Sequence, residues 1–262
     1  MRIDFALKPL EEVMPWGTPP DQVLHWYGLT YGYYRIDLGN VKLFDYTPEV
    51  MTHWAVAYPG ADSDSRVDYQ VARLWEDVIE ALAPALRPLP DRLVAIMADP
   101  NGWQEQCMGW WGAQPDTEEA WDVFDLATAW VGQRYLDSGY LNPDSDVWMW
   151  SHDESVFIQW DNRDKLVEGI PAWTAQHGRC EITVSDFIEA LAVFNAELFR
   201  QMQVRVDAVE AGWCPPGATI DVPHLKREQR ERPWLFAQAF RLPPVIDWLA
   251  TEAACERIQR ET

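Results

Sequence analysis

The sequence predicts an α+β fold in which an antiparallel sheet packs against several amphipathic helices. Stretches near residues 31–46 and 146–161 combine short turns with flanking aromatic and β-branched residues, as β-hairpins do. Three longer stretches, 66–83, 117–137 and 185–211, repeat apolar residues every three or four positions. Because a helix with one wide apolar stripe needs a surface to cover, we expect both hairpins to form one sheet beneath these helices.

The first hairpin sets its own register. Gly39-Asn40 is a two-residue turn with glycine first, which supplies the positive φ of a type II′ turn without steric cost. This turn places Leu38 opposite Val41 and Ile36 opposite Leu43. One face of the hairpin is therefore expected to be core.

The predicted helices have recognisable starts and stripes. Thr47 followed by Pro48 is typical of a capped helix start, and Pro84 is expected to end the helix over 66–83. Asp116 with Glu119 resembles a capping box for the helix over 117–137. The predicted inner stripe of that helix is Trp121, Phe124, Thr128, Val131 and Tyr135.

The second half follows the same logic. The hairpin over 146–161 turns at Asp153-Glu154 and is apolar on both faces, which favours a place between two layers. Residues 181–184 suit another strand, and Ser185 is expected to cap the helix over 185–211. The predicted inner stripe of this helix is Phe187, Leu191, Phe194, Leu198, Met202, Val206 and Val209. Two further helical segments, 223–240 and 244–260, are separated by Pro243-Pro244. We place a boundary near residues 140–144, dividing 1–140 from 141–262 within one compact body.

Composition limits the classes of partner. Lys and Arg total 21 against 42 Asp and Glu, for a formal charge of −21, which argues against direct nucleic-acid binding and against an anionic membrane. A basic protein fits this charge, although acidity also serves to keep a Trp-rich chain soluble. The sequence shows neither a signal peptide nor a long apolar run, so we expect a cytoplasmic protein. Nothing in it fixes an oligomeric state.

The cysteines and histidines predict neither a metal site nor a cofactor. The four cysteines are widely separated and match no metal or redox spacing, so we interpret them as free thiols. The five histidines are equally scattered. The chain also lacks the P-loop, dinucleotide-binding and nucleophile-elbow motifs, which favours a binding protein over an enzyme.

An acidic, Trp-rich segment is the first candidate site. Residues 93–133 contain no Lys or Arg, and the chain has 16 tryptophans. Buried packing and helix-dipole pairing are the simpler explanations of these two features. The sharper hypothesis is a docking face for a basic protein, with aromatic anchors among carboxylates. Its predicted partner-binding residues are Trp110, Trp111, Glu118, Glu119 and Asp122.

A second candidate is a ligand site at the end of the second hairpin. The predicted strand ends in a run of four candidate residues, Trp160, Asp161, Asn162 and Arg163. Polar side chains at the end of a strand can converge on a ligand, and His25 is the candidate general base. An Asx-turn with a local ion pair and a hydrogen-bonded core histidine are the structural alternatives.

Several sequence blocks resemble a known family. Five blocks are similar to those of a family of uncharacterised bacterial proteins. They are Pro-Trp-Gly at 15–17, Leu-His-Trp-Tyr-Gly-Leu-Thr at 24–30, Tyr-Gln-Val-Ala-Arg-Leu-Trp-Glu-Asp at 69–77, Leu-Asp-Ser-Gly-Tyr-Leu at 136–141 and Trp-Asp-Asn-Arg-Asp at 160–164. The resemblance implies no activity. From the residues, we expect an immunity-type protein that neutralises a bacterial toxin by occluding its surface. The alternative is a hydrolase or ligand-binding enzyme with its site around residues 161–163.

Overall fold

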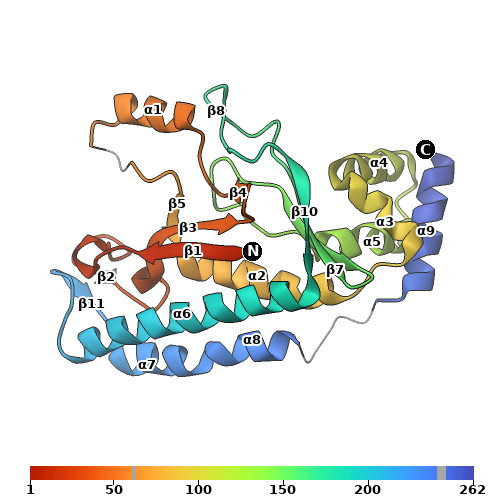
Figure 1. Cartoon of the computed structure of the whole chain (residues 1–262). Helices are drawn as coiled ribbons and strands as arrows, with labels where there is room; N and C mark the ends of the chain where they lie inside the picture. Colours follow the sequence, from red (N-terminus) through yellow and green to blue (C-terminus); the bar gives the residue numbers. More distant parts are fainter. Residues whose placement is uncertain (61–62, 241–245) are drawn as a thin grey trace.

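The computed structural model describes residues 1–60, 63–240 and 246–262, and it confirms the α+β class (Figure 1). One antiparallel sheet contains β1 (Arg2–Leu7), β3 (Tyr31–Asp37), β4 (Lys42–Leu43) and β5 (Val67–Gln70). Strand β3 pairs with each of the other three. This sheet lies in the N-terminal half of the molecule, above the long helix α6 (Val184–Glu210) (Figure 1).

The predicted register of the first hairpin is confirmed. Ile36 faces Leu43, and the Leu38 amide donates to the Val41 carbonyl at 2.9 Å. Gly39 has φ +88°, as its place in the turn requires. The second strand is shorter than the prediction because Phe44 adopts φ 59° and turns the chain away from the ladder.

The second hairpin belongs to a separate sheet, so the prediction of a single sheet was wrong. Strands β6 (Val147–His152) and β7 (Ser155–Asp161) pair across the predicted Asp153-Glu154 turn, and β10 (His177–Thr183) covers the other edge of β7. The predicted strand at 181–184 is therefore the end of a longer strand. Because β10 already pairs with this edge of β7, the edge cannot also pair with a strand of the first sheet.

The predicted position of this hairpin between two layers is confirmed by the two hydrophobic cores. Val147, Met149 and Ile158 point into the larger core, which the first sheet, α2 (Val71–Leu86) and α6 also line. Trp148 and Trp150 point into a smaller core. Each core takes residues from both sides of positions 140–144. The division of the chain at those positions stays a prediction.

The helices around the larger core follow the predicted stripes closely. In α6 all seven predicted inner positions are buried: Phe187, Leu191, Phe194, Leu198, Met202, Val206 and Val209. The cap is Thr183, whose hydroxyl accepts from the Asp186 amide at 3.0 Å, and not the predicted Ser185. Helix α1 (Pro48–Ala57) begins after Thr47 as predicted. Helix α2 begins later than predicted because residues 67–70 form β5.

The smaller core is enclosed by a helical group at one end of the molecule, beside the C terminus (Figure 1). It consists of α3 (Asp91–Val94), α4 (Pro100–Ala113), α5 (Glu118–Gly132) and α9 (Trp248–Glu261). Helix α4 was not predicted, and Thr117 caps α5 in place of Asp116. The fully buried positions of α5 are Ala120, Ala127, Trp130 and Val131. Of the predicted inner stripe, Val131 is buried, Phe124 and Tyr135 pack half-buried against this core, and Thr128 is half-buried, so the prediction was wrong at the exposed Trp121.

Shorter elements complete the chain. They are the 3₁₀ helices Leu10–Glu12, Gly28–Thr30 and Ile96–Ala98, the strands β2 (Gln22–Val23), β8 (Leu166–Val167), β9 (Ile170–Pro171) and β11 (Ala218–Thr219), and the helices α7 (Val222–Glu231) and α8 (Pro233–Ala239). The predicted break at Pro243-Pro244 lies outside the described residues. Within the described part of the chain, no helix is both long and apolar enough to cross a membrane.

Candidate functional site

Helix α5 carries a row of carboxylates on its outer face. Glu118, Asp122 and Asp125 are spaced by four and three residues, so they lie on one side of the helix, and all three are exposed. None of them forms an ion pair or hydrogen bond with the described residues. The predicted partner residue Glu119 differs, because its carboxylate pairs with Arg257 at 2.6 Å. We call Glu118, Asp122 and Asp125 the α5 acidic row.

A pocket of about 450 Å³ opens beside this row, between α5 and the start of α9. Its described lining residues include three carboxylates, those of Asp122, Asp125 and Asp247, and no Lys or Arg. Leu126 and Trp130 supply apolar surface. An acidic rim over an apolar floor suits a long basic side chain, because its methylene groups and its charged end then each meet matching surface. Asp125 and Asp247 were not among the predicted site residues.

The tryptophans of this region divide between core and surface. Trp110 is only 1% exposed, and its indole N–H donates to Glu261 at 2.8 Å, so its prediction as a surface anchor was wrong. Trp111 is half-buried, with its ring centroid 4.1 Å from that of Trp121. Trp121, which the sequence pattern placed inside, is 48% exposed beside the α5 acidic row. Trp121 is therefore the exposed aromatic residue of this face.

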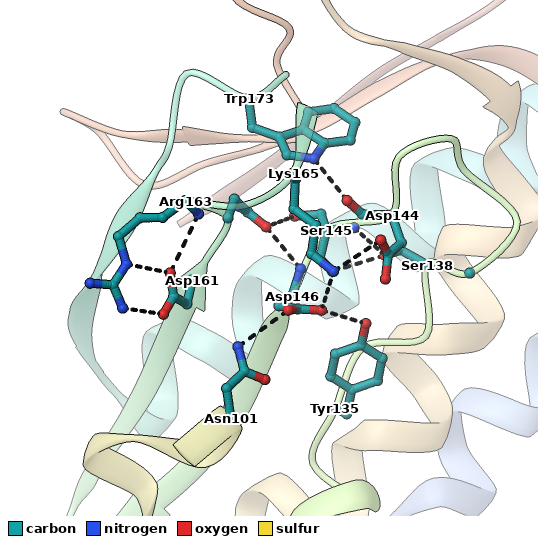
Figure 2. Close-up of polar contacts among 12 residues, drawn as sticks. Asn101, Tyr135, Ser138, Asp144, Ser145, Asp146, Asp161, Arg163, Lys165 and Trp173 are labelled. Atoms are coloured by element: carbon teal, nitrogen blue, oxygen red, sulfur yellow. Dashed lines mark hydrogen bonds and ion pairs between the residues drawn. The ribbon is translucent and has the colours of Figure 1, made fainter. Parts of the chain in front are cut away.

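The predicted ligand site at residues 160–163 is a tightly paired turn (Figure 2). Arg163 forms a bidentate pair with Asp161, at 2.8 Å and 2.5 Å, which holds the pKa of that carboxyl below its usual range. The pair lies at the edge of the cluster and points away from its centre (Figure 2). Trp160 is 3% exposed and packs in the larger core. This is the local ion pair that the sequence left open as the structural alternative.

Asn162 has a structural position. It is 1% exposed, its side-chain oxygen accepts from the Ser145 hydroxyl and the Asp146 amide, and its amide donates to the Ala175 carbonyl at 2.9 Å. Lys165 lies 3.0 Å from Asp144 and 3.1 Å from Asp146 in the same network (Figure 2). With its hydrogen-bonding capacity used by the protein, Asn162 joins the loop over 138–146 to the end of β7.

His25 lies elsewhere, in a pocket of about 680 Å³ that residues 160–163 do not line. We call it the His25 pocket. Four blocks quoted for the family resemblance contribute to it: 15–17 through Trp16, 24–30 through His25 and Tyr27, 69–77 through Arg73 and Glu76, and 136–141 through Tyr140. No local sequence signal unites these residues, because the fold brings them together from α2 and from separate loops.

The charged groups of the His25 pocket neutralise one another. Arg232 lies 2.7 Å from Glu76 and 2.8 Å from Glu228, with its guanidinium over the Trp26 ring. The Tyr27 hydroxyl donates to Glu76. Partial burial lowers the pKa of His25, which favours its neutral form. The wall of the pocket therefore carries paired charges.

A buried carboxyl lies behind this wall. Asp77 is 2% exposed and accepts from the Tyr140 hydroxyl at 3.0 Å, while Arg73 lies 3.3 Å away. The Tyr140 hydroxyl is also 3.0 Å from that of Tyr34. Removal from water raises the pKa of Asp77 to about 8, and this outweighs the attraction of Arg73.

The raised pKa of Asp77 predicts a pH-dependent stability. Between the unfolded pKa of 3.8 and the folded value of about 8, the folded state binds a proton that the unfolded state has released. Asp77 therefore makes unfolding easier as pH rises through this window, by at most about 1.4 kcal/mol per pH unit. We expect Asp77→Asn to flatten the fall in unfolding free energy, measured by urea denaturation at several pH values. An unchanged slope in the variant would mean that Asp77 is ionised throughout.

The described His, Cys, Asp and Glu side chains are of the kinds that bind metal ions when several of them converge. Within the described ranges, no group of three His, Cys, Asp or Glu side chains is arranged to hold a metal ion. All four cysteines are free, and burial raises the pKa of Cys107 and Cys255 to about 12. These two thiols are therefore poor nucleophiles.

Comparison with known proteins gives a family without an activity. Residues 2–254 match the family of unknown function DUF5984. No curated protein and no solved structure matches the chain.

Proposed function

The chain belongs to this family of unknown function, and from its geometry we propose that it is an acidic binding protein of the immunity type. In this proposal it occludes the active surface of a basic protein, such as a cognate bacterial toxin, in the cytoplasm. The observation that carries the proposal is the α5 acidic row, whose three carboxylates have no counter-charge among the described residues.

The α5 face combines the two features that an occluding interface needs. Unpaired exposed carboxylates attract a basic protein over a distance and speed encounter. Trp121, exposed beside them, can be buried by the partner and slow dissociation. The acidic pocket next to the row offers a place for one Lys or Arg side chain of the partner. A solubilising role alone requires neither the pocket nor the exposed tryptophan.

The alternative hydrolase at residues 161–163 has less support. Arg163 is held by Asp161, and Asn162 has its side-chain hydrogen bonds satisfied within the protein. A catalytic site needs groups that are free to act on a substrate. We therefore place this second function behind the first.

The test is co-expression of this chain with the product of each adjacent gene, followed by purification of any complex. We expect one adjacent product to be toxic alone, harmless with this chain, and bound to it in a stable complex. The same experiment with Trp121→Ala should weaken the complex. If no adjacent product is toxic and none binds, the proposal fails.

A further inference from the structure

The His25 pocket contains polar groups that the protein itself does not use. Gln70 is 9% exposed and lines the pocket, yet its side-chain amide has no hydrogen-bond partner among the described residues. The His25 ring and the Tyr69 hydroxyl also line the pocket without a hydrogen bond to the described protein. These polar groups face the pocket and are not used by the described protein, so they are available to hydrogen-bond a bound molecule.

The walls of the His25 pocket are aromatic. Trp16, 43% exposed, also lines the pocket, with its ring perpendicular to that of His25 and the two ring centroids 4.2 Å apart. Reciprocal backbone hydrogen bonds to Val23, 2.8 Å and 2.9 Å long, fix its position. Tyr69 and Tyr140 stack on one another at 4.7 Å in the same pocket. The volume of about 680 Å³ lies within the general range of small-molecule sites.

Whether the charged side chains of the His25 pocket are already paired indicates which chemical class of ligand it can bind. Arg232 is paired with Glu76 and Glu228, and Arg73 with Asp137, so the described lining leaves neither a free anion site nor a free cation site. The unused groups are an amide, a neutral imidazole and a phenol. Each can donate and accept hydrogen bonds without charge. The matching ligand is neutral and carries several groups that do the same, as a polyhydroxy compound does.

We propose that the His25 pocket binds a carbohydrate, with a sugar ring against Trp16 and its hydroxyl groups on Gln70, His25 and Tyr69. A nucleobase can also stack on a single aromatic face, but the faces that Tyr69 and Tyr140 turn toward one another are closed by their own contact, and Arg73 lies 5.2 Å from the Tyr140 ring. The preference for a sugar therefore rests on the three neutral polar groups, which match several hydroxyl groups around one ring, and nucleosides are the competing class in the test. The puckered ring of a sugar needs only one aromatic face and polar groups around its edge.

The test uses saturation-transfer NMR on the full chain with a panel of neutral mono- and disaccharides at millimolar concentration. Nucleosides and inorganic phosphate form the comparison arms. We expect transfer to the ring protons of at least one sugar and none to the comparison compounds. The absence of transfer to every sugar, or stronger transfer to a nucleoside, would overturn the proposal.

Variants locate the binding. Trp16→Ala removes the aromatic face, and Gln70→Met removes the amide while keeping its volume, so each should weaken sugar binding about tenfold. Trp234→Ala, a change at a tryptophan 65% exposed in α8, is the matched control and should bind normally. Melting temperatures of all three should stay near the parent value. Unchanged affinity in both pocket variants would place the sugar elsewhere and refute the assignment. The described lining residues of this pocket and of the pocket beside the α5 acidic row do not overlap, so either proposal can fail alone.

Discussion

Trp110→Ala is expected to lower the free energy of unfolding by about 3–5 kcal/mol, the general cost of replacing a buried tryptophan by alanine. Trp110 is 1% exposed in the smaller core, and its indole N–H donates to Glu261. The substitution leaves a cavity among α4, α5 and α9 and removes a tie between α4 and the C terminus. Urea denaturation followed by circular dichroism measures the loss.

Trp121→Ala is the matched control for this loss. Trp121 lies one helix away, is 48% exposed, and donates its indole N–H to Asp116 in its own helix-start segment. Its removal should cost less than about 1 kcal/mol of stability. The effect on partner binding should be reversed. When both variants are folded, Trp121→Ala should lower the affinity for the partner more than Trp110→Ala does. Equal stability losses in the two variants would contradict the division between core and surface.

The sequence predicted the elements whose faces are strongly patterned. The stripe of α6 holds one period over more than six turns, from Phe187 to Val209, and every predicted position is buried. The first hairpin was equally predictable because Gly39 fixes its turn. In both elements the local sequence determines which side chains are buried, so they can be predicted without knowledge of contacts with distant residues.

The errors arose where tertiary contacts override local pattern. Helix α5 is apolar on more than one side, and its packing on α9 selects Ala127 and Trp130, which places Trp121 outside. The mixed pattern before α2 fits a helix, yet pairing with β3 makes residues 67–70 a strand. The two sheets could not be separated in advance, since the pairing of β7 with β10 joins segments with no shared local signal.

The candidate site was only partly predictable for the same reason. Glu118 and Asp122 were predicted from the acidic segment itself, and their helical spacing would also have predicted Asp125 as a member of the same row. Asp247 joins them only because α9 packs on α5. The His25 pocket shows the limit more clearly, since Gln70 and Arg232 are far apart in the chain and neither belongs to a motif that indicates a ligand.

Reversing the α5 acidic row to lysine, as Glu118→Lys, Asp122→Lys and Asp125→Lys together, should slow association with a basic partner at least about tenfold. The reason is that exposed charges act mainly on encounter, where complementary fields raise association rates by orders of magnitude. The dependence of the association rate on salt should also fall, since screening acts on the same field. Stability should change little, because exposed charges without partners contribute under about 1 kcal/mol each.

The matched control reverses three exposed carboxylates on other elements, Glu12, Glu189 and Glu231, none of which forms an ion pair among the described residues. Each reversal adds two positive charges, so the two triple variants carry the same net charge. Surface plasmon resonance against the toxic product identified by co-expression gives both association rates. If the row itself is the docking face, only the first variant loses its fast, salt-sensitive association. Equal slowing in both variants would show that total charge alone drives encounter, and normal association in the first would place the interface elsewhere on the molecule.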